Sequence, residues 1–154
     1  MSGLYLTPEQ IFTYATYGVL PFWALLFVLP HLKLTDLVVH SVAAPILLGT
    51  LYLWLFLDGA FTQNGASYAD FLSLAGVMKL FSMKEAVVAG WVHYLVFDLF
   101  VGAWIGRDAQ RCAVPHLLVV PCLLLTLLLG PLGLLAYLLL RGIMNRGGWQ
   151  LFEG

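Results

Sequence analysis

The sequence has few charged residues: seven Lys and Arg and eight Asp and Glu make up 10% of its 154 residues. An average soluble domain carries about 25% charged residues, so this scarcity argues against a soluble globular protein. The net charge of −1 offers no basic surface for phosphates, which argues against nucleic-acid binding. Instead, 62% of the residues are hydrophobic and the mean hydropathy is +0.94. The composition therefore predicts an integral membrane protein.

Cysteine and the motifs of soluble enzymes are also scarce. Cys112 and Cys122 are about 15 Å apart on a helix, which is too far for a disulfide bond, and they form no CxxC motif. The sequence contains no GxSxG, P-loop, GxGxxG or HExxH motif, so it indicates no common soluble-enzyme chemistry. No Lys or Arg precedes the first apolar run, so we expect no cleaved signal peptide.

Four apolar runs are each long enough to cross a bilayer, which takes about 20 residues of helix. Between the second and third runs, apolar residues from Phe71 to Phe81 recur at helical spacing, which predicts a short amphipathic helix at the membrane interface. We therefore predict an all-α integral membrane fold, with residues 1–154 forming a single four-helix domain. The predicted crossings are residues 11–29, 37–57, 84–106 and 113–140, the last of them interrupted by Pro121 and by a break at Gly130–Gly133.

Four crossings would put both ends of the chain on one side of the membrane. The basic residues then divide almost evenly: Lys79, Lys84, Arg141 and Arg146 on the side of the ends, and Lys33, Arg107 and Arg111 on the other. The positive-inside rule gives little preference for such a distribution and slightly favours ends in the cytoplasm. We expect a multi-pass protein of a bacterial inner membrane or a photosynthetic membrane.

Two titratable residues, His93 and Asp98, lie inside the third apolar run. A charge in hydrocarbon costs a few kcal/mol even on lenient scales, so something must offset it. At about 100° per residue the two side chains fall on different faces, which suits a helix at the centre of a bundle. Asp98 is interpreted either as an acid or base or as a structural partner of another helix. Gly102 and Gly106 form a GxxxG pair, which would allow close contact with a helix of this chain or of a second protomer in a homo-oligomer.

Three histidines come from three different apolar runs: His40, His93 and His116. Three imidazoles would suit an iron or zinc site with open positions, although no HxxH, HxxxH or ExxH pair places two ligands on one helix face. An interfacial histidine bonded to a backbone carbonyl is the alternative.

Arg107 and Asp108 follow the third run directly. They are interpreted either as an ordinary interfacial charge cluster or as a polar rim that recognises hydroxyls or lipid phosphates at one end of a long ligand. Aromatic residues of the same run suit a ligand groove as well as an interfacial belt: Trp91, Tyr94 and Trp104.

Four segments of this part of the chain resemble the abscisic-acid-deficient-four-like family of plant and bacterial membrane proteins: GWVHYLVFDLFVG at 90–102, Arg107–Asp108, Pro115–His116 and GPLGLL at 130–135. The resemblance is close from about residue 90 to residue 141 and looser before it. It implies a four-helix membrane fold and a role in carotenoid metabolism. In plant members this role is the formation of neoxanthin from violaxanthin, and in relatives it is the cleavage or isomerisation of β-ring carotenoids. Because the long N-terminal extension of plastid members is missing, we expect a bacterial-type activity.

The resemblance and the residues together suggest three functions. Opening a xanthophyll epoxide to an allenic alcohol requires protonation of the epoxide oxygen and removal of a carbon-bound proton, with Asp98 and His93 as candidate catalytic residues and no cofactor. The candidate substrate-binding residues are Trp91, Tyr94, Trp104, Arg107 and Asp108. Oxidative cleavage would instead require activated oxygen, with His40, His93 and His116 as candidate iron ligands. A non-enzymatic carotenoid-binding protein is the third hypothesis. The expected partners are a carotenoid or xanthophyll and membrane lipid, and no nucleic acid.

Overall fold

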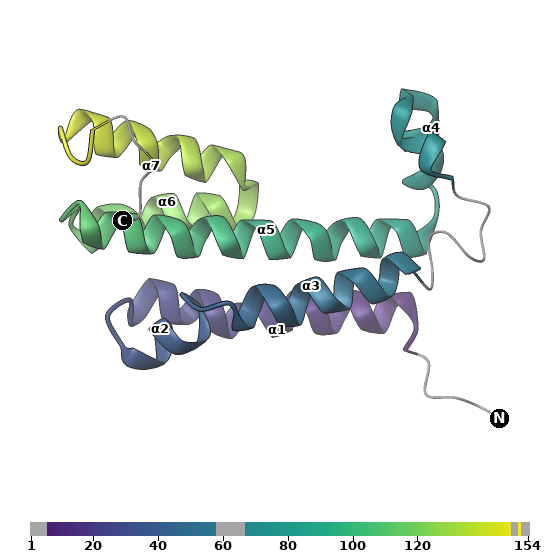
Figure 1. The fold of residues 1–154 in the computed structure, drawn as a ribbon, viewed down its shortest axis with the longest axis horizontal. Helices are drawn as coiled ribbons and strands as arrows, with labels where there is room; N and C mark the ends of the chain where they lie inside the picture. The colour runs from purple at the N-terminus through teal and green to yellow at the C-terminus, as the bar shows by residue number, and fades with distance from the viewer. Residues whose placement is uncertain (1–5, 58–66, 149–150, 152–154) are drawn as a thin grey trace. The chain divides into compact units, whose positions relative to one another are not determined.

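The computed structural model describes residues 6–57, 67–148 and 151, and within these residues every regular element is a helix (Figure 1). The predicted all-α fold is therefore confirmed. In chain order the elements are α1 (Pro8–Val28), α2 (Lys33–Val38), α3 (Ala43–Leu55), the 3₁₀ helix η2 (Tyr68–Leu72), α4 (Leu74–Leu80), α5 (Lys84–Arg111), α6 (His116–Leu129) and α7 (Pro131–Ile143).

Three helical segments of the described residues are long and apolar enough to cross a membrane: Pro8–Val28, Lys33–Leu55 and Lys84–Arg111. They overlap the predicted crossings 11–29, 37–57 and 84–106. The fourth predicted crossing, 113–140, is not confirmed: it forms two helices, α6 of 14 residues and α7 of 13 residues, which the expected break at Gly130 separates. At 1.5 Å per residue each covers about 20 Å, which is less than the hydrocarbon thickness of about 30 Å.

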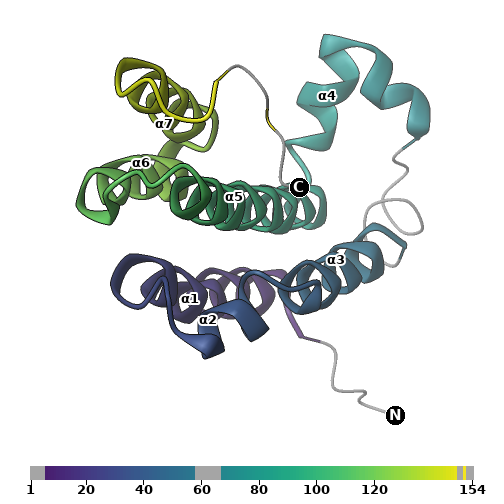
Figure 2. The ribbon, with the colours of Figure 1, turned by 60° about the vertical axis from the view of Figure 1, so that its left-hand side comes forward.

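The break between α6 and α7 reverses the direction of the chain. Gly130 has φ +46° and ψ −96°, a conformation that favours glycine, and Pro131 follows as the first residue of α7, where its missing N–H costs no helical bond. Figures 1 and 2 both show α6 and α7 side by side and antiparallel, as a helical hairpin. The two helices approach closely at Gly133, where a Cβ atom would overlap Thr126.

The second predicted crossing is divided between α2 and α3, with residues 39–42 outside both helices. Thr35 is fully buried, and its hydroxyl donates to the Leu29 carbonyl oxygen at 2.6 Å, which holds α2 against the end of α1. Pro45 lies in the first turn of α3, where a proline is tolerated. Pro21 lies inside α1.

The predicted amphipathic segment folds as η2 followed by α4. Ser67 and Asp70 form a reciprocal capping box at the start of η2, and the Ser73 hydroxyl accepts from the Gly76 N–H at the start of α4. Apolar side chains of this segment are exposed, with Leu72 at 87% and Leu74 at 78%. A helical segment with these exposed side chains fits the predicted place at a membrane interface, which stays a prediction.

Backbone contacts divide the chain into two compact units. The first unit consists of Met1–Gly18 and Pro45–Val96, and the second unit consists of Val19–Ala44 and Phe97–Gly154. The long helices α1 and α5 contribute residues to both. The prediction of a single domain over residues 1–154 stays a prediction.

Candidate functional site

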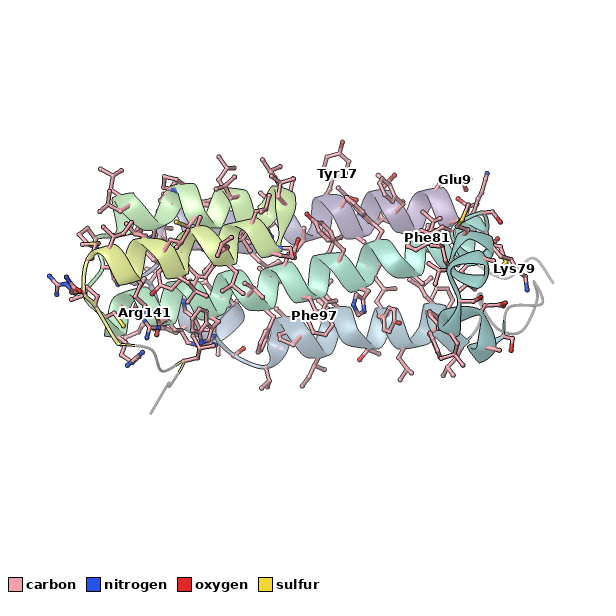
Figure 3. The ribbon with its side chains drawn as sticks, turned by 90° about the horizontal axis from the view of Figure 1, so that it is seen from above. Glu9, Tyr17, Lys79, Phe81, Phe97 and Arg141 are labelled. Atoms are coloured by element: carbon pink, nitrogen blue, oxygen red, sulfur yellow. The ribbon has the colours of Figure 1, made fainter. Side chains whose placement is uncertain are left out.

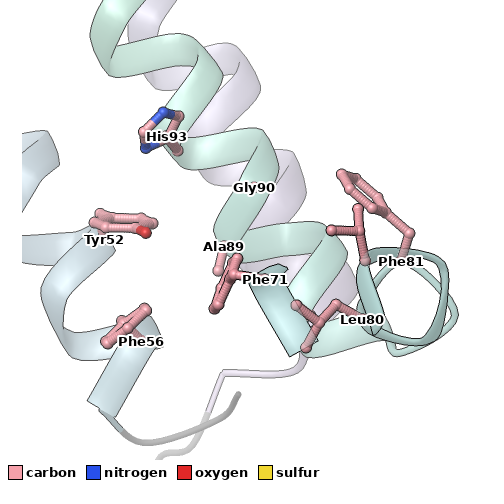
Figure 4. A pocket seen from close by; sticks show the side chains of 10 residues that line it. Tyr52, Phe56, Phe71, Leu80, Phe81, Ala89, Gly90 and His93 are labelled. Atoms are coloured by element: carbon pink, nitrogen blue, oxygen red, sulfur yellow. The ribbon is translucent and has the colours of Figure 1, made fainter. Parts of the chain in front are cut away.

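An apolar cavity of about 240 Å³ lies in the first unit, between α3, the η2–α4 segment and the beginning of α5 (Figure 4). Aromatic rings from three elements form much of its wall, and only two of its lining residues, Tyr52 and His93, carry a polar side-chain group. The lining residues are Tyr52, Phe56, Phe71, Val77, Leu80, Phe81, Ala86, Ala89, Gly90 and His93. Cavities with mostly apolar walls and few polar groups are typical of small-molecule sites.

His93 faces this cavity from α5. Its imidazole ring lies 5.4 Å from the Tyr52 ring of α3, measured between centroids, with the planes inclined by 59°. One turn earlier on α5, Gly90 also lines the cavity, and a Cβ atom added there would meet nothing within 4 Å. The cavity therefore has room beside the imidazole because position 90 carries no side chain.

Trp91 and Tyr94, two of the predicted substrate-binding residues, are not among the residues that line this cavity. The Trp91 indole N–H donates to the Thr16 hydroxyl at 2.8 Å, and its ring lies 5.2 Å from that of Phe12 on α1. Tyr94 stacks on Trp91 at 5.2 Å. These contacts assign Trp91 to the packing of α1 on α5, with Tyr94 stacked on it within α5, and the predicted substrate contacts of both residues remain predictions.

Asp98 lies in the second unit, buried at the turn of the helical hairpin. A Cβ atom at Gly130 would lie only 2.6 Å from the Asp98 Oδ1 atom. The carboxylate thus lies beside the N-terminus of α7, where the helix dipole favours a negative charge. This position favours the structural interpretation of Asp98, and its predicted catalytic role remains a prediction.

Asp108, which the sequence suggested as a polar rim residue, has a fully buried carboxylate at the end of α5. Its Oδ2 atom accepts from the Tyr137 hydroxyl at 2.5 Å and from Arg141 Nη1 at 2.8 Å, and its Oδ1 atom accepts from Arg111 Nη2 at 2.6 Å. The Cys112 Sγ atom lies 3.8 Å from both oxygens. A carboxylate with these partners holds the end of α7 against the end of α5, which favours a structural role.

Arg141, labelled near the end of α7 in Figure 3, is only 2% exposed. Besides Asp108 it binds three backbone carbonyl oxygens: Nε donates to Arg146 at 3.2 Å, and Nη2 donates to Gly147 at 2.6 Å and Gly148 at 2.9 Å. The guanidinium group therefore also holds the segment after α7. Trp104, another predicted ligand-binding residue, packs edge-on against Tyr137 in the same unit.

The three histidines predicted as metal ligands are divided between the two units: His93 lies in the first, and His40 and His116 lie in the second. Among the described residues no three His, Cys, Asp or Glu side chains lie close enough to hold a metal ion together. His116 Nε2 donates to the Phe27 carbonyl oxygen at 2.8 Å, as the alternative interpretation anticipated. The His40 ring packs beside Gly106 of α5, where a Cβ atom would lie 3.2 Å from its Cε1 atom. The iron site predicted at His40, His93 and His116 stays a prediction, without support from a ligand group among the described residues.

Sequence reasoning did not select Tyr52, Phe56 and Phe71, which line the cavity, or Tyr137 and Arg141, which bind Asp108. Both sets carried a signal. Tyr52 and Phe56 are four residues apart, and so are Tyr137 and Arg141, so each pair shares one helix face.

Comparison with known proteins shows which protein family the chain resembles. A family model described as ABA DEFICIENT 4-like matches residues 10–137. The Arabidopsis thaliana protein named "Protein ABA DEFICIENT 4, chloroplastic" is 31% identical over 142 residues, which cover 89% of this chain and 63% of that protein. The chain thus spans less than two thirds of the length of this relative. No solved structure matches the chain.

Proposed function

Because the chain belongs to the ABA DEFICIENT 4-like family, we propose that it acts on carotenoids in a membrane and that the cavity beside His93 receives the ring end of the carotenoid. The observation that carries this proposal is the cavity itself, whose lining residues all lie within the matched range 10–137. Three apolar segments long enough to cross a bilayer fit a membrane location.

The cavity has the chemistry that a β-ring carotenoid or xanthophyll requires. The ring is apolar apart from the hydroxyl or epoxide oxygen that a xanthophyll carries. Phe56, Phe71 and Phe81 supply apolar walls, and His93 and Tyr52 supply the two groups able to exchange a hydrogen bond with that oxygen. Since the wall includes side chains of the amphipathic segment, a ligand would enter this cavity close to the membrane interface.

Proton chemistry in this cavity would amount to isomerisation or epoxide opening. In epoxide opening, a protonated His93 imidazole donates its proton to the epoxide oxygen as a carbon–oxygen bond breaks. A base removes the proton of the adjacent polyene carbon, and that C–H electron pair forms the new double bond of the allene. Reactant and product are isomers, so no oxidant is consumed. Asp98 was the predicted partner of His93, and its place at the hairpin turn makes it the weaker of the two proposed catalytic residues.

The other two functions depend on different observations. Oxidative cleavage by iron would need a ligand group that the described residues do not form, so we assign no step to a metal. A carotenoid-binding protein without catalysis would use the same cavity and differ only in leaving its ligand unchanged.

Cavity-filling and cavity-neutral variants test the binding proposal. Gly90→Leu should place a side chain in the cavity, whereas Gly49→Leu on α3 adds the same group at a position that also has nothing within 4 Å and does not line it. After expression in carotenoid-producing cells, we expect Gly90→Leu to lose most of the bound polyene absorption of the purified wild type and Gly49→Leu to keep it. Equal carotenoid content in the two variants would show that the cavity is not the site.

Catalysis is tested by His93→Phe, which keeps an aromatic wall and removes the proton-transfer group. If the protein is an enzyme, this variant should bind carotenoid and form at least about 100-fold less product in a chromatographic assay. Unchanged product would exclude His93 as the acid. No product from the wild type with any β-ring carotenoid or xanthophyll, together with stable binding, would favour the binding protein.

We also propose a membrane topology with three crossings and a helical hairpin that enters and leaves on one side. The second unit brings the end of α1 and the end of α5 together, because Gln110 Nε2 donates to the Pro30 carbonyl oxygen at 3.0 Å. Arg141 returns to the same end by binding Asp108. Five of the seven basic residues then lie on this side, namely Lys33, Arg107, Arg111, Arg141 and Arg146, and two on the other, Lys79 and Lys84.

Under the positive-inside rule this distribution of basic residues favours one orientation clearly, whereas the distribution for four crossings was nearly even. The end of α7 should face the cytoplasm, and the beginning of α1 should face the opposite side. Single cysteines introduced at Gln10 and at Arg146 test this with a membrane-impermeant thiol reagent. We expect the reagent to label only the first in intact cells and both after permeabilisation. Labelling of both or neither in intact cells would favour an even number of crossings.

A further inference from the structure

The second unit contains a groove of about 820 Å³ at the end of α7, which shares no lining residue with the cavity beside His93. Its floor and sides combine exposed aliphatic residues with a cation: Leu139 and Ile143 come from α7, Leu151 from the following segment, and Arg146 adds a positive charge on an exposed side chain. The remaining lining residues are Leu138, Arg141, Gly142, Asn145 and Gly148. An aliphatic surface beside a cation suits a molecule with an acyl chain and an anionic head.

Arg141 organises the polar end of this groove. Its guanidinium group draws in the carbonyl oxygens of Arg146, Gly147 and Gly148. In a planar trans peptide the N–H group points opposite to the carbonyl oxygen, so the N–H groups of Gly147 and Gly148 point away from Arg141. Gly147 and Gly148 both have positive φ, at +70° and +63°. The segment thus turns its acceptors inward and its donors outward, which favours an anion on its outer side.

The charges of the surrounding groups point the same way. Asp108 is the carboxylate bound here, and it faces both Arg111 and Arg141, so this cluster carries one positive charge in excess. Arg146 adds a second positive charge at the groove. Each Lys or Arg near an anionic membrane surface strengthens attraction to it by a factor of about five.

We propose that this groove binds an anionic phospholipid, with the phosphate at Arg146 and one acyl chain along Leu139 and Ile143. A lipid is favoured over a free phosphate because four of the nine lining residues are Leu or Ile, and over a carotenoid because the polar end is cationic. The proposal does not depend on the carotenoid function.

Lipid titrations of the purified full-length chain in neutral detergent test it. The ligands are phosphatidylglycerol, phosphatidylcholine and inorganic phosphate, and native mass spectrometry and thermal unfolding report binding. We expect wild type to bind phosphatidylglycerol at least about five-fold more tightly than phosphatidylcholine. Arg146→Gln should abolish this preference, whereas Lys33→Gln, which removes an equal charge outside the groove, should retain it. Equal affinities in wild type, or equal losses in the two variants, would overturn the proposal, as would stabilisation by inorganic phosphate alone.

Gly142→Leu examines the acyl-chain half of the groove. Position 142 lines the groove, and a Cβ atom there meets nothing within 4 Å, so a leucine fills the groove while every charge stays in place. Leucine also suits a helix better than glycine, so the hairpin should remain folded. We expect weaker binding of both phospholipids. Binding unchanged from wild type would show that the acyl chain does not lie in this groove.

Discussion

The two units of the protein treat their polar groups in opposite ways. In the second unit, the buried Asp108 carboxylate binds Tyr137, Arg111 and Arg141, and Arg141 uses its other donors on backbone carbonyls. In the first unit, the His93 imidazole faces a cavity of about 240 Å³ with aromatic walls. The second unit surrounds the Asp108 carboxylate with protein partners, and the first unit leaves space beside the His93 imidazole.

This difference distinguishes two roles that a polar residue in an apolar helix can have: binding a ligand, or joining helices. Ionisable residues within a membrane are expected to be functional by default. Asp108 shows that such a residue can instead join helices, because its bonds to α7 hold the hairpin against α5. A ligand can approach only where the protein leaves volume next to the polar group, which the structure provides at His93 and not at Asp108.

The largest expected effect is on thermal stability, and it distinguishes the structural role of Asp108 from the ligand-binding role proposed for His93. Asp108→Asn leaves the buried Arg141 without its charged partner, and breaking a buried ion pair in this way costs about 3–5 kcal/mol. Thermal unfolding in detergent, followed by light scattering, should show a large fall in midpoint temperature. His93→Phe in the first unit should change the midpoint little, because the imidazole is an exposed cavity wall.

Arg111→Gln is the matched control for Asp108→Asn, since it removes the other cation that binds the same carboxylate. The Arg111 side chain is 36% exposed, so solvent screens the pair and the loss of stability should be much smaller than that of Asp108→Asn. If Arg111→Gln were as destabilising as Asp108→Asn, net charge and not burial would determine stability at this end of α5. A large effect of His93→Phe would assign that residue to packing as well.

The second prediction concerns the hairpin that carries Arg141 to Asp108. Gly130→Ala adds a Cβ atom 2.6 Å from the Asp98 carboxylate and strains a residue at φ +46°, so we expect a loss of about 1–3 kcal/mol. Gly142→Ala in α7 meets nothing within 4 Å and should stabilise the helix by up to about 1 kcal/mol. Unfolding temperatures of the two variants should therefore move in opposite directions. A shared direction would mean that the turn tolerates a side chain, and that Asp98 is not packed against it.

The sequence predicted the elements whose signals are local. Length and apolar composition placed α1 and α5 within a few residues, and the spacing of apolar residues predicted the amphipathic segment before Lys84. The hairpin could not be predicted in the same way. The break at Gly130 and Pro131 was visible, but an interrupted crossing and a reversal have the same composition, and the φ of Gly130 decides between them.

The candidate sites were harder to predict because they depend on pairs far apart in the chain. Asp108 and Arg141 are separated by 33 residues, and their ion pair exists only because α7 returns along α5. Likewise, Tyr52 joins His93 in the cavity through the packing of α3 on α5, which no local pattern encodes. His93 was predicted because a titratable residue in an apolar run is unusual whatever it contacts.

The smallest expected effect is the pH dependence of the η2–α4 segment. The Ser67 N–H donates to the Asp70 carboxylate at 2.8 Å and Lys79 Nζ donates at 3.1 Å, and these bonds lower the pKa of Asp70 below its ordinary value of 3.8. A carboxyl group whose pKa is lowered on folding stabilises the fold above its ordinary pKa, and this stabilisation disappears as the pH falls through the lowered value. Amide hydrogen exchange of residues 67–80, corrected for intrinsic rates, should thus accelerate as the pH falls below the ordinary pKa of 3.8 and through the lowered pKa of Asp70. In Asp70→Asn the exchange should be faster at the higher pH and lose most of this dependence, because the amide keeps its shape but cannot ionise. Identical pH profiles for wild type and Asp70→Asn would mean that the capping box contributes nothing to holding α4, and the wall of the cavity that α4 supplies would then need another support.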